Sequence, residues 1–220
     1  MHLTPPVQRC VSVRPCFNSD SSRMLLLMLQ QPYTYYKASY TEKISMDEFA
    51  CAKPPGRGYR YLPPDSEDVL LPAFHGLSYT NFTLRSATPT ARTLRNQPLT
   101  NALQLDFVVE NVGDREGAET ILAFFRPENR TNPGGAQLLP LQRRLCGLEK
   151  VVLAPHATAH LNISISADAL VMADEQGALV SMPGKYSIIL SRGTVGAEEI
   201  TVPLTLEGER LVLETLPPGI

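Results

Sequence analysis

Short runs in which apolar and polar residues alternate constrain the fold of this 220-residue chain more than any other feature. The clearest runs cover residues 103–109, 159–165 and 200–206, where every second residue is Leu, Phe, Val, Ala or Ile. Because successive side chains of a β-strand point to opposite faces, such alternation is typical of strands with one buried face. The nineteen prolines add turns and argue against long helices. We therefore predict an all-β protein.

Other segments fit the same prediction. Residues 82–84 and 186–190 also alternate, and residues 138–153 carry enough apolar positions for a strand pair or one bent strand. Residues 120–125 offer two apolar faces, of which one must meet the core. Six or seven short strands separated by turns are typical of a two-sheet sandwich of the fibronectin type III or immunoglobulin architecture.

Two local features are expected between these strands. Residues 111–117 are interpreted as a turn in which Gly113 and Gly117 adopt positive φ, a conformation that glycine adopts without steric strain. Residues 168–175 are the one short helical candidate, and Asp168 is the candidate N-cap of that helix.

The charge of the chain argues against two classes of partner. The formal net charge is −2, and nucleic acids or anionic membranes would need clustered basic residues. We interpret the scattered arginines and the acidic residues as a solvated surface: Arg92, Arg95, Arg143, Arg144, Asp47, Glu48, Asp65, Glu67, Asp68, Glu116, Glu119, Asp174 and Glu175. The apolar run at 24–29 is too short for a membrane span and lies too far into the chain for a secretory signal, so no signal peptide is readable.

The four cysteines are too few and too widely spaced to hold a fold together by themselves. Cys10 and Cys16 either close a small loop in an oxidising compartment or remain thiols, and the redox states of Cys51 and Cys146 stay open. No second Cys-x-x-Cys or His-x-x-x-His stands near them, so we expect no zinc site. Three Asn-x-Ser/Thr triplets are candidate N-glycosylation sites: Asn81, Asn129 and Asn162.

A resemblance to a known family rests first on the segment Leu71–Phe82, which reads LPAFHGLSYTNF. It is similar to the phrase P-F-G-H-G-L-S-Y-T-x-F with which family 3 glycoside hydrolases begin their C-terminal fibronectin-like domain. Ala73 and Phe74 depart from that phrase, because they replace its usual aromatic residue and glycine. Upstream, Pro55–Tyr61 (PGRGYRY) resembles the P-G-R-T-Y-R-[FY] phrase of the β-xylosidase branch, and Tyr40–Met46 resembles that branch's Y-x-x-x-I-x-M run.

Three downstream segments resemble the same family. Val109–Gly113 is similar to its V-x-N-T-G, Leu145–Pro155 to its L-x-G-F-x-R-V-x-L-x-P, and Pro183–Ile188 to its P-G-x-Y-x-[IV]. The resemblance therefore runs from about residue 32 to about residue 206, in the order and spacing of the family.

The resemblance implies a division of the chain. Residues 1–31 are an unassigned, weakly ordered leader, and residues 32–78 are an extended, mostly irregular remnant of the tail of the family's α/β layer with a linker. Residues 79–207 are the fibronectin type III-like sandwich, and residues 208–220 are a C-terminal tail. The tyrosines of residues 33–61 would pack against a neighbour in the parent enzyme and are expected to be exposed here.

The resemblance also implies a function. The parent reaction is the retaining hydrolysis of O-glycosyl bonds in xylan or other plant polysaccharide oligomers, which needs two carboxyl groups. In the family the nucleophilic Asp and the acid/base Glu precede the region represented here, and neither phrase occurs in this sequence. We therefore predict no catalytic residue, no cofactor and an accessory domain that packs on its own catalytic domains, inactive alone. The resemblance favours a secreted protein.

Other chemistries receive little support. His75 is interpreted as a packing or hydrogen-bonding residue rather than a sugar contact, and Ser78 does not form the G-x-S-x-G elbow. A pairing of Cys146 with His156 or His160 has no pattern behind it, and the two histidines lead into a predicted strand rather than share a helix face. Residues 132–135 form a loop, not a phosphate cradle. The alternative function is a stand-alone carbohydrate- or protein-binding sandwich, with Phe124, Phe125 and the 33–40 tyrosines as its aromatic surface.

Overall fold

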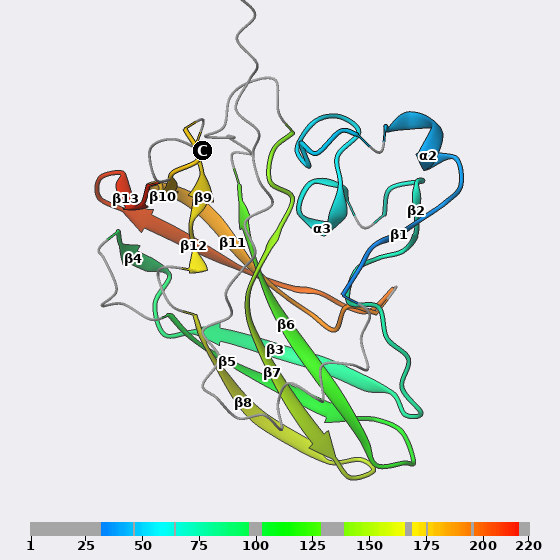
Figure 1. Cartoon of the computed structure of the whole chain (residues 1–220). Coiled ribbons are helices and arrows are strands. Elements are labelled where there is room, and N and C mark those ends of the chain that lie inside the picture. The colour runs from blue at the N-terminus through cyan, green and yellow to red at the C-terminus, as the bar shows by residue number, and fades with distance from the viewer. Residues whose placement is uncertain are drawn as a thin grey trace, which may run out of the picture.

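The computed structural model describes residues 32–45, 47–63, 65–96, 103–128, 139–165, 169–174, 176–194 and 196–215, and all structural statements concern these ranges. Two sheets form the body of the molecule (Figure 1). The larger sheet has the order β4 (Thr93–Arg95), β12 (Ile200–Glu207), β11 (Gly184–Ser191), β6 (Gly117–Pro127) and β7 (Arg144–Leu153). The smaller has the order β3 (Phe82–Pro89), β5 (Leu103–Asn111) and β8 (Thr158–Ile165). Neighbouring strands are antiparallel, except that β4 runs parallel to β12.

The core lies between these two sheets. In β5 the burial pattern alternates as the sequence predicts, so Leu103, Leu105, Phe107 and Val109 are buried while Asp106 is exposed. Facing side chains come from the larger sheet, and the same cluster includes Ile121, Phe125, Ile188, Leu190, Val202 and Leu204. This arrangement confirms the predicted all-β, two-sheet sandwich. Of the region predicted as a strand pair or one bent strand, the described residues 139–153 contain one strand, β7, with an irregular register opposite Ala123 and Phe124.

Strand β6 is buried on both faces, whereas its two apolar faces in the sequence predicted only that one of them meets the core. One face contributes Ile121, Ala123 and Phe125 to the main core. The opposite face places Leu122 and Phe124 in a second cluster with Ile189 of β11. Because β6 and β11 lie inside the sheet and its outer face is covered as well, nearly every side chain along them is buried.

Residues 32–78 provide that cover. They contain two four-residue helices, α2 (Tyr40–Lys43) and α3 (Gly58–Tyr61), and a two-stranded sheet of β1 (Tyr35–Tyr36) and β2 (Val69–Leu71). In Figure 1 these elements gather on one side of β6. Tyr59 lies 5.0 Å from Phe74 and 6.0 Å from Phe124, measured between ring centroids, so the segment packs on the outer face of the larger sheet.

The expectation that the tyrosines of this segment are exposed is therefore wrong for most of them. Tyr36 and Tyr40 stack with 4.1 Å between their ring centroids, and Tyr40 is buried in a third small cluster with Leu62 and Val69. Tyr61 packs against the main core. Tyr33 and Tyr35 are exposed, as expected. The chain itself supplies a neighbour for the tyrosines that are covered.

A buried polar cluster joins the start of β3 to the end of β5. The Asn111 side chain is fully buried, and its Nδ2 donates to the carbonyls of Arg115 (2.7 Å), Leu153 (3.1 Å) and Ala154 (3.1 Å). Its Oδ1 accepts from Thr80 Oγ1 (2.7 Å) and from the Gly113 amide (3.1 Å). These bonds hold the 111–117 turn and the β7–β8 turn together.

The two glycines of this turn have a different role from the predicted one. Neither Gly113 nor Gly117 is among the residues with positive φ. A Cβ at Gly113 would instead lie 2.3 Å from Thr80 Oγ1, and a Cβ at Gly117 would lie 2.5 Å from Thr80 Cγ2. Glycine is needed at both positions because Thr80 approaches the turn closely.

The predicted helix at 168–175 is wrong where the structure describes it. Met172–Ala173 is strand β9, and it pairs with β10 (Leu179–Ser181), which also pairs with β13 (Leu211–Glu214). Three consecutive residues, 170–172, are buried, a pattern that a one-sided surface helix does not provide. Asp168, its predicted N-cap, lies outside the described residues, as do the leader 1–31, the apolar run 24–29 and the loop 132–135. Neither four-residue helix of the described ranges has the length and apolar character of a membrane-spanning helix.

Candidate interaction surfaces

Several acidic residues form ion pairs in the described part of the chain. Three of those interpreted as solvated are in fact buried and bound to a basic side chain, so that interpretation was wrong for them. Asp68 Oδ1 lies 2.7 Å from Lys43 Nζ, Glu119 Oε2 lies 2.8 Å from Arg192 Nε, and Asp174 pairs with Arg210. Asp47 and Glu116 are exposed, as expected. Each of the three buried carboxylates is therefore part of an ion pair. Glu175 lies outside the described residues.

Cys146 is not hydrogen-bonded to His156 or His160. Burial raises the pKa of the Cys146 thiol to about 12, and its Sγ bonds to the Ala123 carbonyl at 3.2 Å. A thiol that stays protonated is a weak nucleophile. His156 lies in the β7–β8 turn and contacts Asp114 Oδ1 at 3.0 Å, whereas His160 lies on β8. Among the described residues, no three His, Cys, Asp or Glu side chains gather as a metal site would require.

The residues of the phrase 71–82 divide between packing and exposure. Phe74 has a φ of 69°, a conformation that glycine adopts readily, and the family phrase has glycine at this place. Its ring packs on Tyr59 and Phe124. His75 is half-buried in the turn that follows, where its amide donates to the Pro72 carbonyl at 3.2 Å. Ser78 is exposed and accepts a hydrogen bond from the Thr80 amide at 3.3 Å.

Large exposed apolar side chains concentrate in the segment 33–79. Leu77 is 90 % exposed and Tyr79 is 94 % exposed, just before β3. The segment also exposes Tyr33, Tyr35, Phe49 and Leu70. In contrast, the large apolar side chains that residues 80–215 expose, where described, are three valines: Val112, Val152 and Val212. We call the six exposed residues of segment 33–79 the exposed apolar set: Tyr33, Tyr35, Phe49, Leu70, Leu77 and Tyr79.

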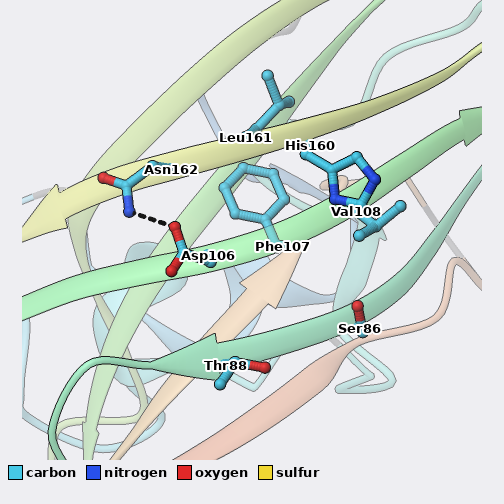
Figure 2. A pocket seen from close by; sticks show the side chains of 8 residues that line it. All are labelled: Ser86, Thr88, Asp106, Phe107, Val108, His160, Leu161 and Asn162. Carbon is cyan, nitrogen blue, oxygen red and sulfur yellow. Dashed lines mark hydrogen bonds between the residues drawn. The ribbon is translucent and has the colours of Figure 1, made fainter.

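A shallow hollow of about 450 Å³ lies on the outer face of the smaller sheet. Figure 2 shows its lining, in which Asp106 and Asn162 point toward one another across β5 and β8 while His160 lies beside Val108. Asn162 Nδ2 donates to Asp106 Oδ1 at 2.7 Å. The hollow therefore has a single carboxylate, already bound to an amide, and does not provide the two carboxyl groups of a glycosidase.

The three sequons fall in different settings. Asn81 is exposed immediately before β3, and Asn162 is exposed on β8 at the rim of the hollow. Asn129 lies outside the described residues. Both described asparagines therefore present their side chains at the surface.

Two arginines interpreted as solvated are buried. Arg143 is 7 % exposed and Arg144 is 8 % exposed. Arg143 Nη1 lies 3.0 Å from Glu199 Oε1, and its guanidinium carbon lies 4.7 Å from the centroid of the Phe124 ring. The sequence contained no sign of this burial, because the distant 32–78 segment packs at the start of β7, where both residues stand.

Comparisons with known proteins agree with this architecture. Residues 131–193 match the family model of the fibronectin type III-like domain. The probable beta-glucosidase J of Neosartorya fischeri is 31% identical over 161 residues, which are 70% of this chain and 18% of that protein. A xylan 1,4-beta-xylosidase of Xylanibacter ruminicola is 32% identical over 152 residues, 69% of this chain and 16% of that protein. A solved family 3 exo-beta-xylosidase, XlnD, in complex with a xylobiose aziridine activity-based probe, superposes with a TM-score of 0.65 at 22% identity and covers 84% of this chain and 25% of its own.

The sandwich and the family model together define an all-β module of the fibronectin type III-like class. With the sequence relatives, they group the chain with the β-xylosidases and β-glucosidases of glycoside hydrolase family 3, of which it matches a part. The chain spans about a fifth of the length of the curated relatives that it matches.

Proposed function

We propose that the chain is an accessory domain that packs on the catalytic domains of a larger family 3 glycoside hydrolase, and that it hydrolyses no glycoside alone. The observation that carries this proposal is the exposed apolar set, and above all Leu77 and Tyr79. Large exposed apolar side chains in one region mark interaction sites in soluble proteins. The set lies in the segment that connects to the sandwich, so a partner docked there would contact the module at its N-terminal side.

The proposed parent reaction is the retaining hydrolysis of O-glycosyl bonds in xylan or other plant polysaccharide oligomers. It is supported by the names of the relatives, a xylan 1,4-beta-xylosidase and a probable beta-glucosidase. In the described residues, Asp68, Glu119 and Asp174 are each bound to a basic side chain, so none of them is placed as a nucleophile or an acid/base. The two carboxyl groups would come from domains outside this chain.

We also propose an extracellular location, with glycans on Asn81 and Asn162. Both asparagines are exposed and stand in Asn-x-Ser/Thr triplets. Cys51 is disulfide-bonded, and disulfides persist chiefly in oxidising compartments. Expression in a secreting yeast should give a product that loses mass on treatment with an N-glycosidase. Loss of that shift in Asn81→Gln plus Asn162→Gln would support the two sites, and an unchanged shift would assign the glycan elsewhere.

The hydrolytic part of the proposal is tested with the purified chain on 4-nitrophenyl β-xyloside and β-glucoside. We expect no nitrophenol release above the uncatalysed rate, whereas the Xylanibacter relative serves as the active control. Turnover that survives repurification would refute the proposal.

The docking part is tested by measuring association with the portion of the Neosartorya relative that lies outside the matched region. We expect Leu77→Ser plus Tyr79→Ser to weaken association at least tenfold while leaving the melting temperature of the chain unchanged, because both side chains are exposed. Val152→Ser, which changes an exposed apolar residue of the sandwich, is the matched control and should associate as the wild type does. Equal association of all three proteins would argue against this surface.

The alternative, a stand-alone carbohydrate-binding sandwich, loses two of its candidate aromatic residues. Phe124 and Phe125 are buried and therefore have no face on which a sugar ring stacks. Tyr33, Tyr35 and Tyr79 keep exposed rings. Retention of the chain on insoluble xylan, lost in Tyr33→Ala plus Tyr35→Ala, would favour this alternative over the accessory role.

A further inference from the structure

We propose that Arg60 and Arg144 form a binding site for a carboxylate group, located where helix α3 meets the start of β7. This site does not depend on the accessory function, because it rests on the contacts of the two guanidinium groups. Either a side chain of another domain or a small soluble carboxylate supplies the same chemistry, and the test below separates the two sources.

The two arginines come from segments that pack on each other. Arg60 belongs to α3, and its carbonyl accepts a hydrogen bond from the Gln142 amide at 2.7 Å. Two residues further on, Arg144 opens β7 opposite Phe125 of β6. The Leu139 amide donates to the Ala52 carbonyl at 2.7 Å, so residues 139–144 follow the 52–60 segment over a longer stretch.

Most donors of these two guanidinium groups have no partner within the described ranges. Arg144 Nη1 donates to the Val171 carbonyl, and this is the hydrogen bond that its side chain makes there. The Nε atoms of Arg60 and Arg144 are both buried without a hydrogen-bond partner. Neither residue takes part in an ion pair of the described residues. A guanidinium offers five N–H donors, so both have unused capacity.

The basic group that acts on Arg144 is Arg60. Burial lowers the pKa of Arg144, and the positive charge of Arg60 lowers it further. A buried charge without a counter-ion is strongly unfavourable, so an anion placed here would stabilise the fold.

The chemistry of the site favours a carboxylate. A guanidinium presents parallel N–H donors in a planar fork that matches the two oxygens of a carboxylate. Arg60 is only partly buried, so an anion can reach the site from solvent. Tyr61 lies against the Arg60 guanidinium, 5.9 Å from its carbon to the ring centroid, and limits the approach on that side.

The test compares the melting temperature of the purified chain in sodium acetate and in sodium chloride at equal ionic strength and pH 7. At ten times its dissociation constant, a bound carboxylate should raise the melting temperature by about 3–5 °C for a domain of this size. The shift should disappear in Arg60→Met, which changes a half-buried side chain, and in Arg144→Met. It should shrink in Arg144→Lys, which keeps the charge and loses the fork.

Arg85→Met is the matched control, because it removes an exposed guanidinium that pairs with Glu110 on the smaller sheet. It should keep the full acetate shift. The proposal would be overturned if the wild type had the same melting temperature in acetate and in chloride. It would also be overturned if Arg60→Met and Arg144→Met both kept the acetate shift. Because Arg60→Met and Arg144→Met act on different segments, misfolding of one variant leaves the other to decide.

Association with the remainder of the Neosartorya relative separates the sources. If a side chain of that part supplies the carboxylate, Arg60→Met weakens association about tenfold and acetate competes with it. If the ligand is a small soluble carboxylate, association is the same for Arg60→Met and wild type, while the acetate shift in melting temperature remains. Both outcomes support the site, and the absence of both effects contradicts it.

Discussion

Replacing Asn111 with alanine should destabilise the sandwich more than any single surface change. The wild-type side chain is fully buried and takes part in five hydrogen bonds: its two N–H donors are shared among three carbonyls, and its Oδ1 accepts two bonds. One intramolecular hydrogen bond contributes about 1 kcal/mol net, and each buried partner left unsatisfied costs about 1–3 kcal/mol. Some of the freed carbonyls lie near the surface turn and will bind water, so we expect a loss of about 4 kcal/mol in unfolding free energy.

The unfolding free energy is measured by urea denaturation, monitored by circular dichroism. An m-value equal to that of the wild type checks that unfolding remains two-state. Thr80→Val is the partner variant, because it removes one of the five bonds and should lose about 1 kcal/mol. The double variant should lose less than the sum of the two, since both changes break the same bond.

Asn111→Asp tests the polarity of the cluster. It keeps the oxygen that accepts from Thr80 and Gly113 but directs a carboxylate at the carbonyls of Leu153 and Ala154. The pKa of the new carboxyl should be raised in the folded state, so its destabilisation should grow as pH rises above the unfolded-state pKa of about 4. A loss below about 1.5 kcal/mol for Asn111→Ala would refute the reasoning, because it would mean that water replaces the whole cluster.

Three further predictions follow from single contacts. Phe74→Ala should destabilise more than Phe74→Gly by about 1 kcal/mol, because both lose the packing on Tyr59 but only glycine relieves the positive φ; urea unfolding that ranks them the other way would contradict this. Glu119→Gln should lose about 3 kcal/mol in the same assay because it breaks a buried ion pair, whereas breaking an exposed pair with Arg85→Met should lose less than about 1 kcal/mol. The Cys146 thiol, with its pKa raised from 9.0 to about 12 by burial, should react with an aromatic disulfide reagent at pH 8 far more slowly in the folded than in the unfolded chain. For the same reason the unfolding free energy should fall as pH rises from about 9 toward 12, because only the unfolded chain ionises there; a flat profile in that window would count against a buried thiol.

The alternating runs predicted three core strands because the side-chain direction along a strand is a local property. Residues 103–109, 159–165 and 200–206 became β5, β8 and β12 with the predicted residues facing the core. The phrase 71–82 predicts the start of the module, and β3 begins at its last residue, Phe82. The sequence lacks both catalytic phrases of the family, and this absence predicted an accessory domain. The match to about a fifth of the length of the relatives agrees with that prediction.

What lies on the second face of a strand depends on which distant segment folds over it, and the sequence contains no local sign of that. The sequence therefore left three features open: the cover of Phe124 by Tyr59 and Phe74, the burial of Arg144, and the close approach of Thr80 to Gly113. Each brings together residues at least 27 positions apart. The sequence by itself determined the alternating core strands, the class of module and its family. Only the tertiary structure decided which tyrosines and arginines are buried, because the packing of the 32–78 segment on the larger sheet sets the environment of both.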